Sequence, residues 1–320
     1  MAFSKESLVA TEPERNHLRS TSAPAAAVAW PDGKTSAACL SFDVDAESAI
    51  LSIDTRAANR MGPMSHQAYG PLVGVPRILE ILERHRIRST FFVPGYTADR
   101  YPDTVRAIRD GGHEIAHHGY LHEDTTNLSR DAEASMLDRG LEAILSATGI
   151  TPVGYRAPMW EINYHTPALL TERGFQYDSS LMDSDHPYLL AVEGAVGGTT
   201  LVEIPVSWAL DDWEQYAYLP GLIGSGLIES PSKALEMWML ELEALHQIGG
   251  VFSLTCHPFL SGRPSRASAL EQLVRRMEEI PGLWIASLEE IAAHVRNLDL
   301  EPRRVTKPEL PGENPGPESD

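Results

Sequence analysis

Strand-like and helix-like patterns alternate along most of this chain. Short apolar or β-branched runs, typical of buried strands, are separated by longer segments whose apolar residues recur at helical spacing. The strand-like runs cover residues 37–45, 88–93, 113–117, 154–157, 201–208, 251–257 and 283–286. The helix-like segments cover residues 72–85, 103–110, 129–147, 166–173 and 230–245, and one more begins after 287. This repeated order is typical of a parallel sheet with right-handed helical crossovers.

Local signals mark the ends of several of these helices. Ser129 is placed to cap the helix that follows it, and Gly149 stands just beyond the end of that helix. Ser287 and Glu290 have the spacing of a capping box, in which each side chain bonds the backbone of the other residue. These signals support the helical interpretation of both segments.

About seven or eight strand–helix units fit into this length, which favours a closed barrel over an open sheet. We therefore predict an α/β fold, a distorted (β/α) TIM-like barrel that forms a single domain over residues 31–300. Residues 1–30 are expected to be a mobile arm, and the proline-rich residues 301–320 a disordered tail. Two long connections, 48–70 and 209–229, are expected to be loops that act as lids or interface elements.

Composition narrows the class of protein further. The 320 residues carry a net charge of −19, nearly all of it in the predicted domain, which argues against a nucleic-acid partner. No apolar run approaches the roughly 18 residues of a membrane helix. The two cysteines form no disulfide framework, and the polar N-terminal stretch lacks the apolar core of a secretion signal. We therefore expect a cytoplasmic location and no membrane partner.

Unusual polar residues follow four of the predicted strands. In a parallel barrel these strand ends share one rim, where the chemistry of such folds is found. The residues are, in chain order, Asp43 and Asp45, His118 and His122, Arg156, and His257. They therefore form the candidate active site.

The spacing within this set suits a divalent metal. Asp43 and Asp45 are two apart, so on a strand both point to one face, where two carboxylates need a cation, a proton or an arginine between them. His118 and His122 are four apart, which one helical turn would bring together. Each pair is a weak signal alone: the aspartates could form a solvated turn, and His113 has the same spacing to the next histidine.

One carboxylate with two histidines would leave coordination positions open, as catalytic metal sites do. Such a metal lowers the pKa of a bound water, whose proton the second carboxylate could accept. His257 could then protonate the leaving group, and Arg156 could keep the basic carboxylate ionised.

Four motifs, in this order, resemble those of the polysaccharide deacetylase family, the NodB-homology fold. They are Phe42-Asp43-Val44-Asp45-Ala46-Glu47, His118 to His122, Arg156-Ala157-Pro158, and Leu254-Thr255-Cys256-His257-Pro258. The resemblance covers about residues 35–297 and implies a distorted (β/α) barrel. It implies that Asp43 is the general base, that Asp45, His118 and His122 bind the metal, that Arg156 pairs with the base, and that His257 is the general acid. The metal it implies is usually Zn²⁺, with Co²⁺, Ni²⁺ or Mn²⁺ as alternatives.

The first two motifs depart from the usual family pattern. Val44 separates the aspartates, which are adjacent in most members, and Gly119 replaces the usual serine or threonine. Residues 178–183 and 257–265 resemble a branch that includes a cytoplasmic-type peptidoglycan deacetylase and hydrolases of cyclic imides and ureides. The expected substrate is therefore a small amide or imide or an N-acetylated sugar, and the expected reaction is hydrolysis of a non-peptide C–N bond.

Five further residues are candidates for the substrate pocket. Trp160, Trp208 and Trp213 lie near strand ends, where they either wall the pocket or simply pack. Glu47 and Glu161 lie beside the motifs and are candidates for supporting the site.

Other functions stay open at this point. The chain could be a metal-free, allantoin-type ureide hydrolase, a non-catalytic sugar-binding relative, or a barrel that binds an ion only for stability. The complete Asp/His/His set and Asp43 argue against the sugar-binding relative. The open coordination positions and His257 argue against a barrel that binds an ion only for stability. We also expect a homo-oligomer, either a dimer or a tetramer.

Overall fold

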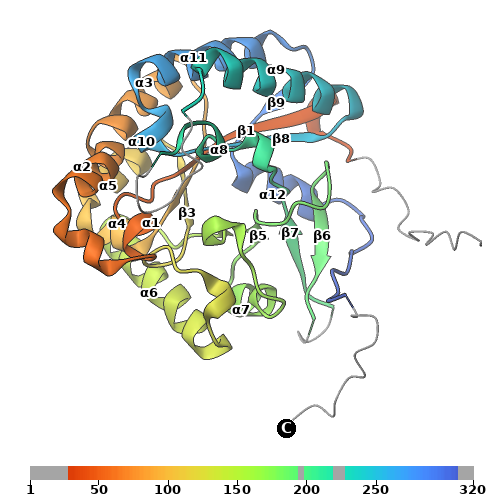
Figure 1. Cartoon of the computed structure of the whole chain (residues 1–320). Coiled ribbons are helices and arrows are strands. Elements are labelled where there is room, and N and C mark those ends of the chain that lie inside the picture. Colours follow the sequence, from red (N-terminus) through yellow and green to blue (C-terminus); the bar gives the residue numbers. More distant parts are fainter. Residues whose placement is uncertain (1–27, 194–197, 219–227, 309–320) are drawn as a thin grey trace, which may run out of the picture.

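The computed structural model describes residues 28–193, 198–218 and 228–308 (Figure 1). Nine strands within these ranges belong to one sheet. They are β1 (Ser36–Asp43), β2 (Thr90–Val93), β3 (Glu114–His117), β4 (Gly154–Tyr155), β5 (Tyr177–Asp178), β6 (Tyr188–Ala191), β7 (Thr200–Glu203), β8 (Val251–Cys256) and β9 (Leu283–Ile285).

The sheet has the order β6-β7-β5-β4-β3-β2-β1-β8, and β9 pairs with the start of β1. Every pairing is parallel except that of β6 with β7. The sheet curls with most of its helices outside, and no strand ladder joins β6 to β8 in the described part of the chain (Figure 1). The predicted distorted barrel is thus confirmed as a curled, mostly parallel half-barrel, and the expected complete closure is not seen there.

The helices lie mostly outside the curled sheet, although the last one packs with the residues of its inner face (Figure 1). They are α1 (Ser48–Leu51), α2 (Met61–Tyr69), α3 (Val75–His85), α4 (Gly95–Arg100), α5 (Pro102–Asp110), α6 (Arg130–Thr148), α7 (Thr166–Glu172), α8 (Trp213–Tyr216), α9 (Pro231–Ile248), α10 (Pro258–Ser261), α11 (Pro264–Glu279) and α12 (Leu288–Arg296). Ser129 caps α6 through the N–H of Ala132, and Ser287 and Glu290 form the predicted capping box of α12. Among the described residues, no helix has both the length and the apolarity needed to cross a membrane.

Alternation along β1 positions the site. Leu40 and Phe42 on one face pack into a core with the outer helices, whereas Cys39 on the other face packs inside the curl. Because side chains alternate along a strand, Asp43 shares the inner face with Cys39. The first strand therefore delivers its carboxylates to the interior of the barrel rim.

The expected loop at 48–70 is wrong, because these residues form α1, a 3₁₀ turn at Thr55–Asn59 and α2. A π-turn at Gly70–Gly74 then joins α2 to α3. Pro71 lies inside this turn, and a proline has no N–H for a regular helical bond. The interrupted helical spacing concealed this long helical segment from the pattern of apolar residues.

Residues on both sides of the expected boundaries at 31 and 300 contact the barrel. Trp30 is buried, and its indole N–H donates to the carbonyl of Gly249 at 2.8 Å. Arg303, in the expected tail, pairs with Leu190 of β6 as a parallel bridge. Residues 1–27 and 309–320 lie outside the described residues, as do residues 219–227 of the second expected loop.

Candidate active site

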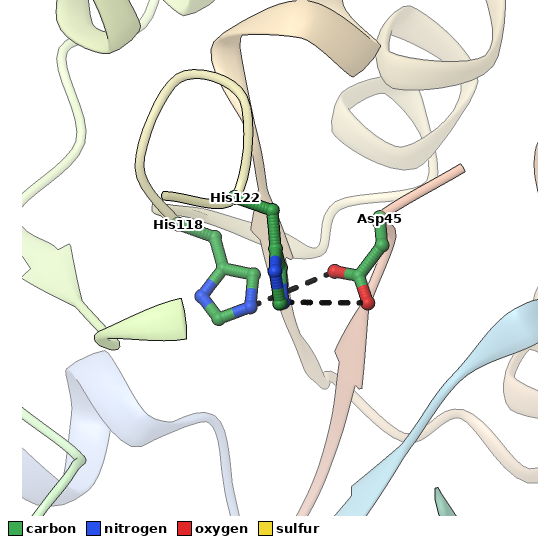
Figure 2. Close-up of side chains that lie close together, drawn as sticks. All are labelled: Asp45, His118 and His122. Atoms are coloured by element: carbon green, nitrogen blue, oxygen red, sulfur yellow. Dashed lines mark ion pairs between the residues drawn. The ribbon is translucent and has the colours of Figure 1, made fainter. Parts of the chain in front are cut away.

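One carboxylate and two imidazoles gather at the rim where β1 and β3 end (Figure 2). The Nε2 atom of His118 lies 3.6 Å from Oδ1 of Asp45, and the Nε2 atom of His122 lies 3.8 Å from Oδ2. All three side chains are buried, and their ligand atoms lie within 4.8 Å of one another. The structure therefore brings together the three residues proposed to bind a metal.

A turn, not the expected helical turn, brings the two histidines together. Residues 118–122 are non-helical, and both Gly119 (φ 71°) and His122 (φ 59°) have left-handed backbone conformations. The carboxylate of Glu123 closes the turn, because its Oε2 accepts the N–H groups of Tyr120 and Leu121 at 3.0 and 2.9 Å. The four-residue spacing was informative, but the geometry behind it was a tight loop.

The state of these side chains fits a divalent cation. Neither oxygen of Asp45 receives a hydrogen bond from a described residue. The Nδ1 atom of His118 lies 2.8 Å from the carbonyl of Arg156, which leaves its Nε2 atom facing Asp45. Burial lowers the pKa of His118 to about 3, so the ring is neutral and its lone pair is available. A buried carboxylate without donors beside a neutral imidazole is a suitable donor set for a metal.

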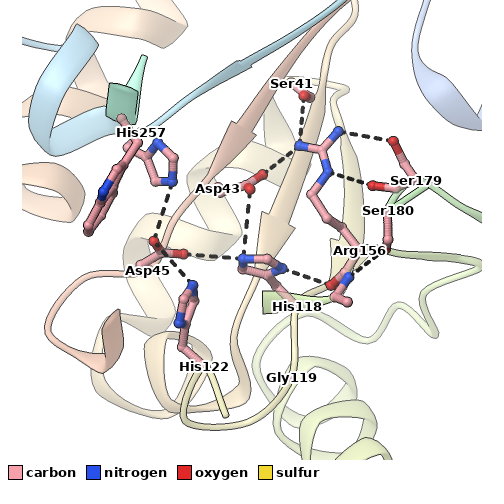
Figure 3. A network of polar contacts seen from close by, with 12 residues as sticks. Ser41, Asp43, Asp45, His118, Gly119, His122, Arg156, Ser179, Ser180 and His257 are labelled. Atoms are coloured by element: carbon pink, nitrogen blue, oxygen red, sulfur yellow. Dashed lines mark hydrogen bonds and ion pairs between the residues drawn. The ribbon is translucent and has the colours of Figure 1, made fainter. Parts of the chain in front are cut away.

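Arg156 holds the other carboxylate of the pair (Figure 3). Its fully buried guanidinium donates to Oδ1 of Asp43 at 2.8 Å and to the hydroxyl of Ser41 at 2.9 Å. Its remaining donors reach the carbonyl and hydroxyl of Ser179, both at 3.1 Å. The Oδ2 atom of Asp43 lies 3.7 Å from Nε2 of His118. One oxygen of Asp43 is thus anchored while the other faces the Asp/His/His cluster.

His257 approaches the same cluster from the end of β8 (Figure 3). Its Nε2 atom lies 3.6 Å from Oδ2 of Asp45, and its Nδ1 atom lies 2.7 Å from Oδ1 of Asp212. Burial alone would lower the pKa of His257, but Asp211, Asp212 and Asp45 outweigh burial and raise it to about 10. The ring is therefore protonated at neutral pH.

Asp212 was not identified from the sequence. Its Oδ1 accepts both the backbone N–H and the ring Nδ1–H of His257, and its Oδ2 accepts the hydroxyl of Ser261. The side chains of Asp211, Asp212 and His257 also lie close enough together to hold a metal ion. However, both oxygens of Asp212 already accept hydrogen bonds, from His257 and Ser261. The available signal was the pair of aspartates just before Trp213, within a stretch interpreted only as a long loop.

A cavity of about 170 Å³ opens beside these residues and is walled largely by aromatic side chains. Trp160, Trp208 and Trp213 all line it. The rings of Trp160 and Trp208 lie 4.4 Å apart, and Trp213 meets His257 edge-on at 5.2 Å. Met159, which has an unusual left-handed backbone, completes this part of the wall. The three tryptophans therefore lie where the sequence placed them.

The two glutamates proposed for the pocket lie elsewhere. Glu47 is buried, but its Oε1 accepts the guanidinium of Arg100 at 3.1 Å and the hydroxyl of Tyr101 at 2.6 Å. Glu161 is exposed, and its backbone forms hydrogen bonds: its carbonyl accepts the hydroxyl of Thr125 at 2.6 Å, and its N–H donates to the carbonyl of Pro158 at 3.1 Å. Neither residue lines the cavity, since proximity to a motif in the chain does not determine where a side chain points.

Comparison with known proteins agrees with this geometry. The model of the polysaccharide deacetylase family matches residues 69–177. A peptidoglycan deacetylase from Helicobacter pylori is 31% identical over 242 residues, which cover 69% of this chain and 83% of the relative. A peptidoglycan deacetylase-like protein from Gibberella zeae is 32% identical over 285 residues, which cover 79% of this chain and 84% of that protein. A Mycobacterium smegmatis protein assigned to the polysaccharide deacetylases has a crystal structure that superposes with a TM-score of 0.87. Its sequence is 58% identical, and the match covers 90% of this chain and 99% of that protein.

The fold and these relatives define a class of enzyme, the hydrolases of carbon–nitrogen bonds other than peptide bonds. Within that class, the chain belongs to the polysaccharide deacetylase family, as its motifs indicated.

Proposed function

We propose that this protein is a divalent-metal-dependent hydrolase of a C–N bond in a small amide or imide. The observation that carries the proposal is the arrangement of two supported side chains around one cluster. Asp43, anchored by Arg156, and His257, anchored by Asp212, both approach the Asp45–His118–His122 cluster (Figure 3).

Asp45, His118 and His122 would hold the metal, with Zn²⁺ the first candidate and Co²⁺, Ni²⁺ or Mn²⁺ the alternatives. A bound divalent ion supplies a Lewis acid that polarises a carbonyl and lowers the pKa of water.

Side chains of this protein carry out the proton transfers of the reaction. Asp43 accepts a proton from the attacking water, and the guanidinium of Arg156 holds that carboxylate in place through its Oδ1 atom. As the new C–O bond forms and the C–N bond breaks, His257 donates its Nε2 proton to the leaving nitrogen. Asp212 holds the ring of His257 in the orientation that this transfer needs. Water is the only co-reactant. A simple amide gives a carboxylic acid and an amine, whereas a cyclic imide opens to one molecule that carries a carboxylic acid and an amide.

The size and lining of the cavity support a small substrate. About 170 Å³ is below the roughly 300–1,000 Å³ of pockets for drug-sized ligands. Trp160 and Trp208, whose rings pack against each other at 4.4 Å, give the cavity aromatic surface on which a planar amide or imide ring could pack. An N-acetylated sugar is the second candidate, because the Helicobacter pylori relative is a peptidoglycan deacetylase.

One activity panel tests the proposal. Zinc-loaded protein is incubated with succinimide, hydantoin, allantoin and N-acetylglucosamine oligomers, with and without a chelator. We expect metal-dependent hydrolysis of at least one small ring compound and none by Asp43→Asn. Release of acetate from the oligomers alone would reassign the substrate to sugars. Undiminished turnover in chelator would indicate a metal-free ureide hydrolase, and no turnover of any compound would contradict the proposed reaction.

A further inference from the structure

Asp211 is a buried acidic residue in the cavity that the proposed reaction does not use. It is 4% exposed and lines the cavity. Its backbone is fixed to β8, because Asp211 forms a parallel bridge with Thr255 and the next residue donates its N–H to the Thr255 carbonyl at 3.0 Å. The side chain therefore occupies a rigid position in the wall.

Only one oxygen of Asp211 is engaged. Its Oδ1 accepts the backbone N–H of Trp213 at 2.7 Å and lies 3.6 Å from Nδ1 of His257. No described residue donates a hydrogen bond to Oδ2. The nearest imidazole already directs its Nδ1 proton to Asp212 at 2.7 Å. Among the described residues, the Oδ2 atom of Asp211 is therefore an acceptor without a donor.

Apart from the Asp/His/His cluster, Asp43 and His257, two carboxylates line the cavity, those of Asp211 and Glu214, and Asp211 is the buried one. Apolar side chains, among them Trp160, Trp208, Met159 and Ile53, form much of the remaining lining. Burial, the largest influence, raises the pKa of Asp211 to about 7, which reflects the poor solvation of its charge there. A poorly solvated carboxylate gains most from a ligand that supplies a hydrogen-bond donor.

We propose that Asp211 is a specificity-determining acceptor, which binds an N–H or O–H group of the substrate beside the scissile C–N bond. This inference rests on the proposed function and narrows its substrate class. Ring compounds with a free N–H, such as cyclic imides and ureides, satisfy the acceptor, whereas their N-alkylated analogues leave it unpaired. Substrates with a carboxylate at this position are disfavoured by repulsion from Asp211.

The informative variant is Asp211→Asn. The Trp213 N–H retains the carbonyl oxygen of the new amide, so the NH₂ group takes the place of Oδ2. An acceptor becomes a donor with almost no change in volume. Glu214→Gln is the matched control, since it makes the same chemical change on an exposed carboxylate at the cavity's edge. Asp211→Ser removes the carboxylate without added bulk if the asparagine variant does not fold.

Two readouts are taken with hydantoin and with its 1-methyl and 3-methyl derivatives. The first is kcat/KM of the zinc-loaded protein. The second is the Kd on metal-free protein, measured by quenching of tryptophan fluorescence, because three tryptophans line the cavity. In the wild type we expect at least one N-methylation to lower kcat/KM and to raise the Kd, each by roughly tenfold or more. The preference for hydantoin over its methyl derivative, expressed as the ratio of their kcat/KM or Kd values, falls towards one in Asp211→Asn. Glu214→Gln keeps the wild-type ratio. Comparing ratios removes the intrinsic effect of methylation on reactivity.

The outcomes separate this inference from the proposed reaction. A binding preference that Asp211→Asn abolishes, without turnover of any compound, supports the acceptor and contradicts the hydrolase. Turnover with the same N–H preference in wild type and variant overturns the acceptor. An equal loss of kcat for every compound also overturns it, because Asp211 would then act through His257. Absence of binding by all three compounds overturns it as well.

Discussion

Asp212 accepts two hydrogen bonds from His257, one from the backbone N–H at 2.9 Å and one from ring Nδ1 at 2.7 Å. This double contact fixes both the position and the tilt of the imidazole, so that its Nε2 atom faces Asp45. A general acid needs this kind of preorganisation, since its proton must already lie near the leaving group.

Replacing Asp212 should therefore impair turnover without loss of metal. Asp212→Asn removes the charge that holds the ring proton, and we expect kcat to fall by roughly a hundredfold or more. Ser261→Ala, which removes only the hydroxyl on the far oxygen of Asp212, should have a much smaller effect. Steady-state kinetics and metal analysis of the same preparations check this. Unchanged kcat, or loss of metal from Asp212→Asn, would contradict the role.

A second pair of variants separates metal binding from proton transfer. His118→Ala removes one of three ligand atoms that lie within 4.8 Å, so bound metal should drop well below one equivalent. Asp43→Asn leaves all three ligands in place and should keep stoichiometric metal while abolishing hydrolysis. Elemental analysis after dialysis distinguishes the two. Full metal content in an active His118→Ala protein would remove His118 from the ligand set.

The π-turn at Gly70–Gly74 packs directly against α10, which begins at the residue after His257. A Cβ on Gly74 would overlap the backbone carbonyl of Pro258, and one on Gly62 would meet nothing within 4 Å. Gly74→Ala should therefore lower the free energy of unfolding by about 1–3 kcal/mol. Gly62→Ala, in α2, should raise it by about 0.4–1 kcal/mol. Urea unfolding measures both, and equal effects would show that the close contact is absent in solution.

Much of this site was predictable because strand ends of a parallel sheet share one rim. The alternation along β1 predicted that Asp43 and Asp45 share one face, and the strand-like run of β8 placed His257 at the same edge of the sheet. Arg156 could be found in the same way, although β4 has only two residues.

The remaining features depend on contacts that no local pattern encodes. Asp212 follows a 3₁₀ turn rather than a strand, so its position beside His257 depends on how that turn packs on β8. Glu47 lies two residues from Asp45, yet it turns away to Arg100 because Ala46 has a left-handed backbone. The paired strands β6 and β7 include a reversal that the repeated strand–helix order did not predict.

A buried glutamate away from the site should make stability depend on pH. Glu114 of β3 accepts hydrogen bonds from Thr90 and Tyr177, both at 2.6 Å, and from the N–H of Glu289 at 2.9 Å. Burial nevertheless raises its pKa from 4.5 to about 7. The folded state thus binds this proton more tightly than the unfolded chain does. Its contribution to stability is fully present below about pH 4.5 and is lost as the pH rises towards 7.

Glu114→Gln isolates this contribution, because glutamine does not titrate. Between pH 5 and 8, the wild type should lose up to about 3 kcal/mol relative to the variant. His113 and His117, whose pKa values burial lowers to about 4, act in the opposite direction but are common to both proteins. Urea unfolding of both proteins at several pH values gives the difference directly. Parallel curves for the two proteins would show that Glu114 has an ordinary pKa in the folded state.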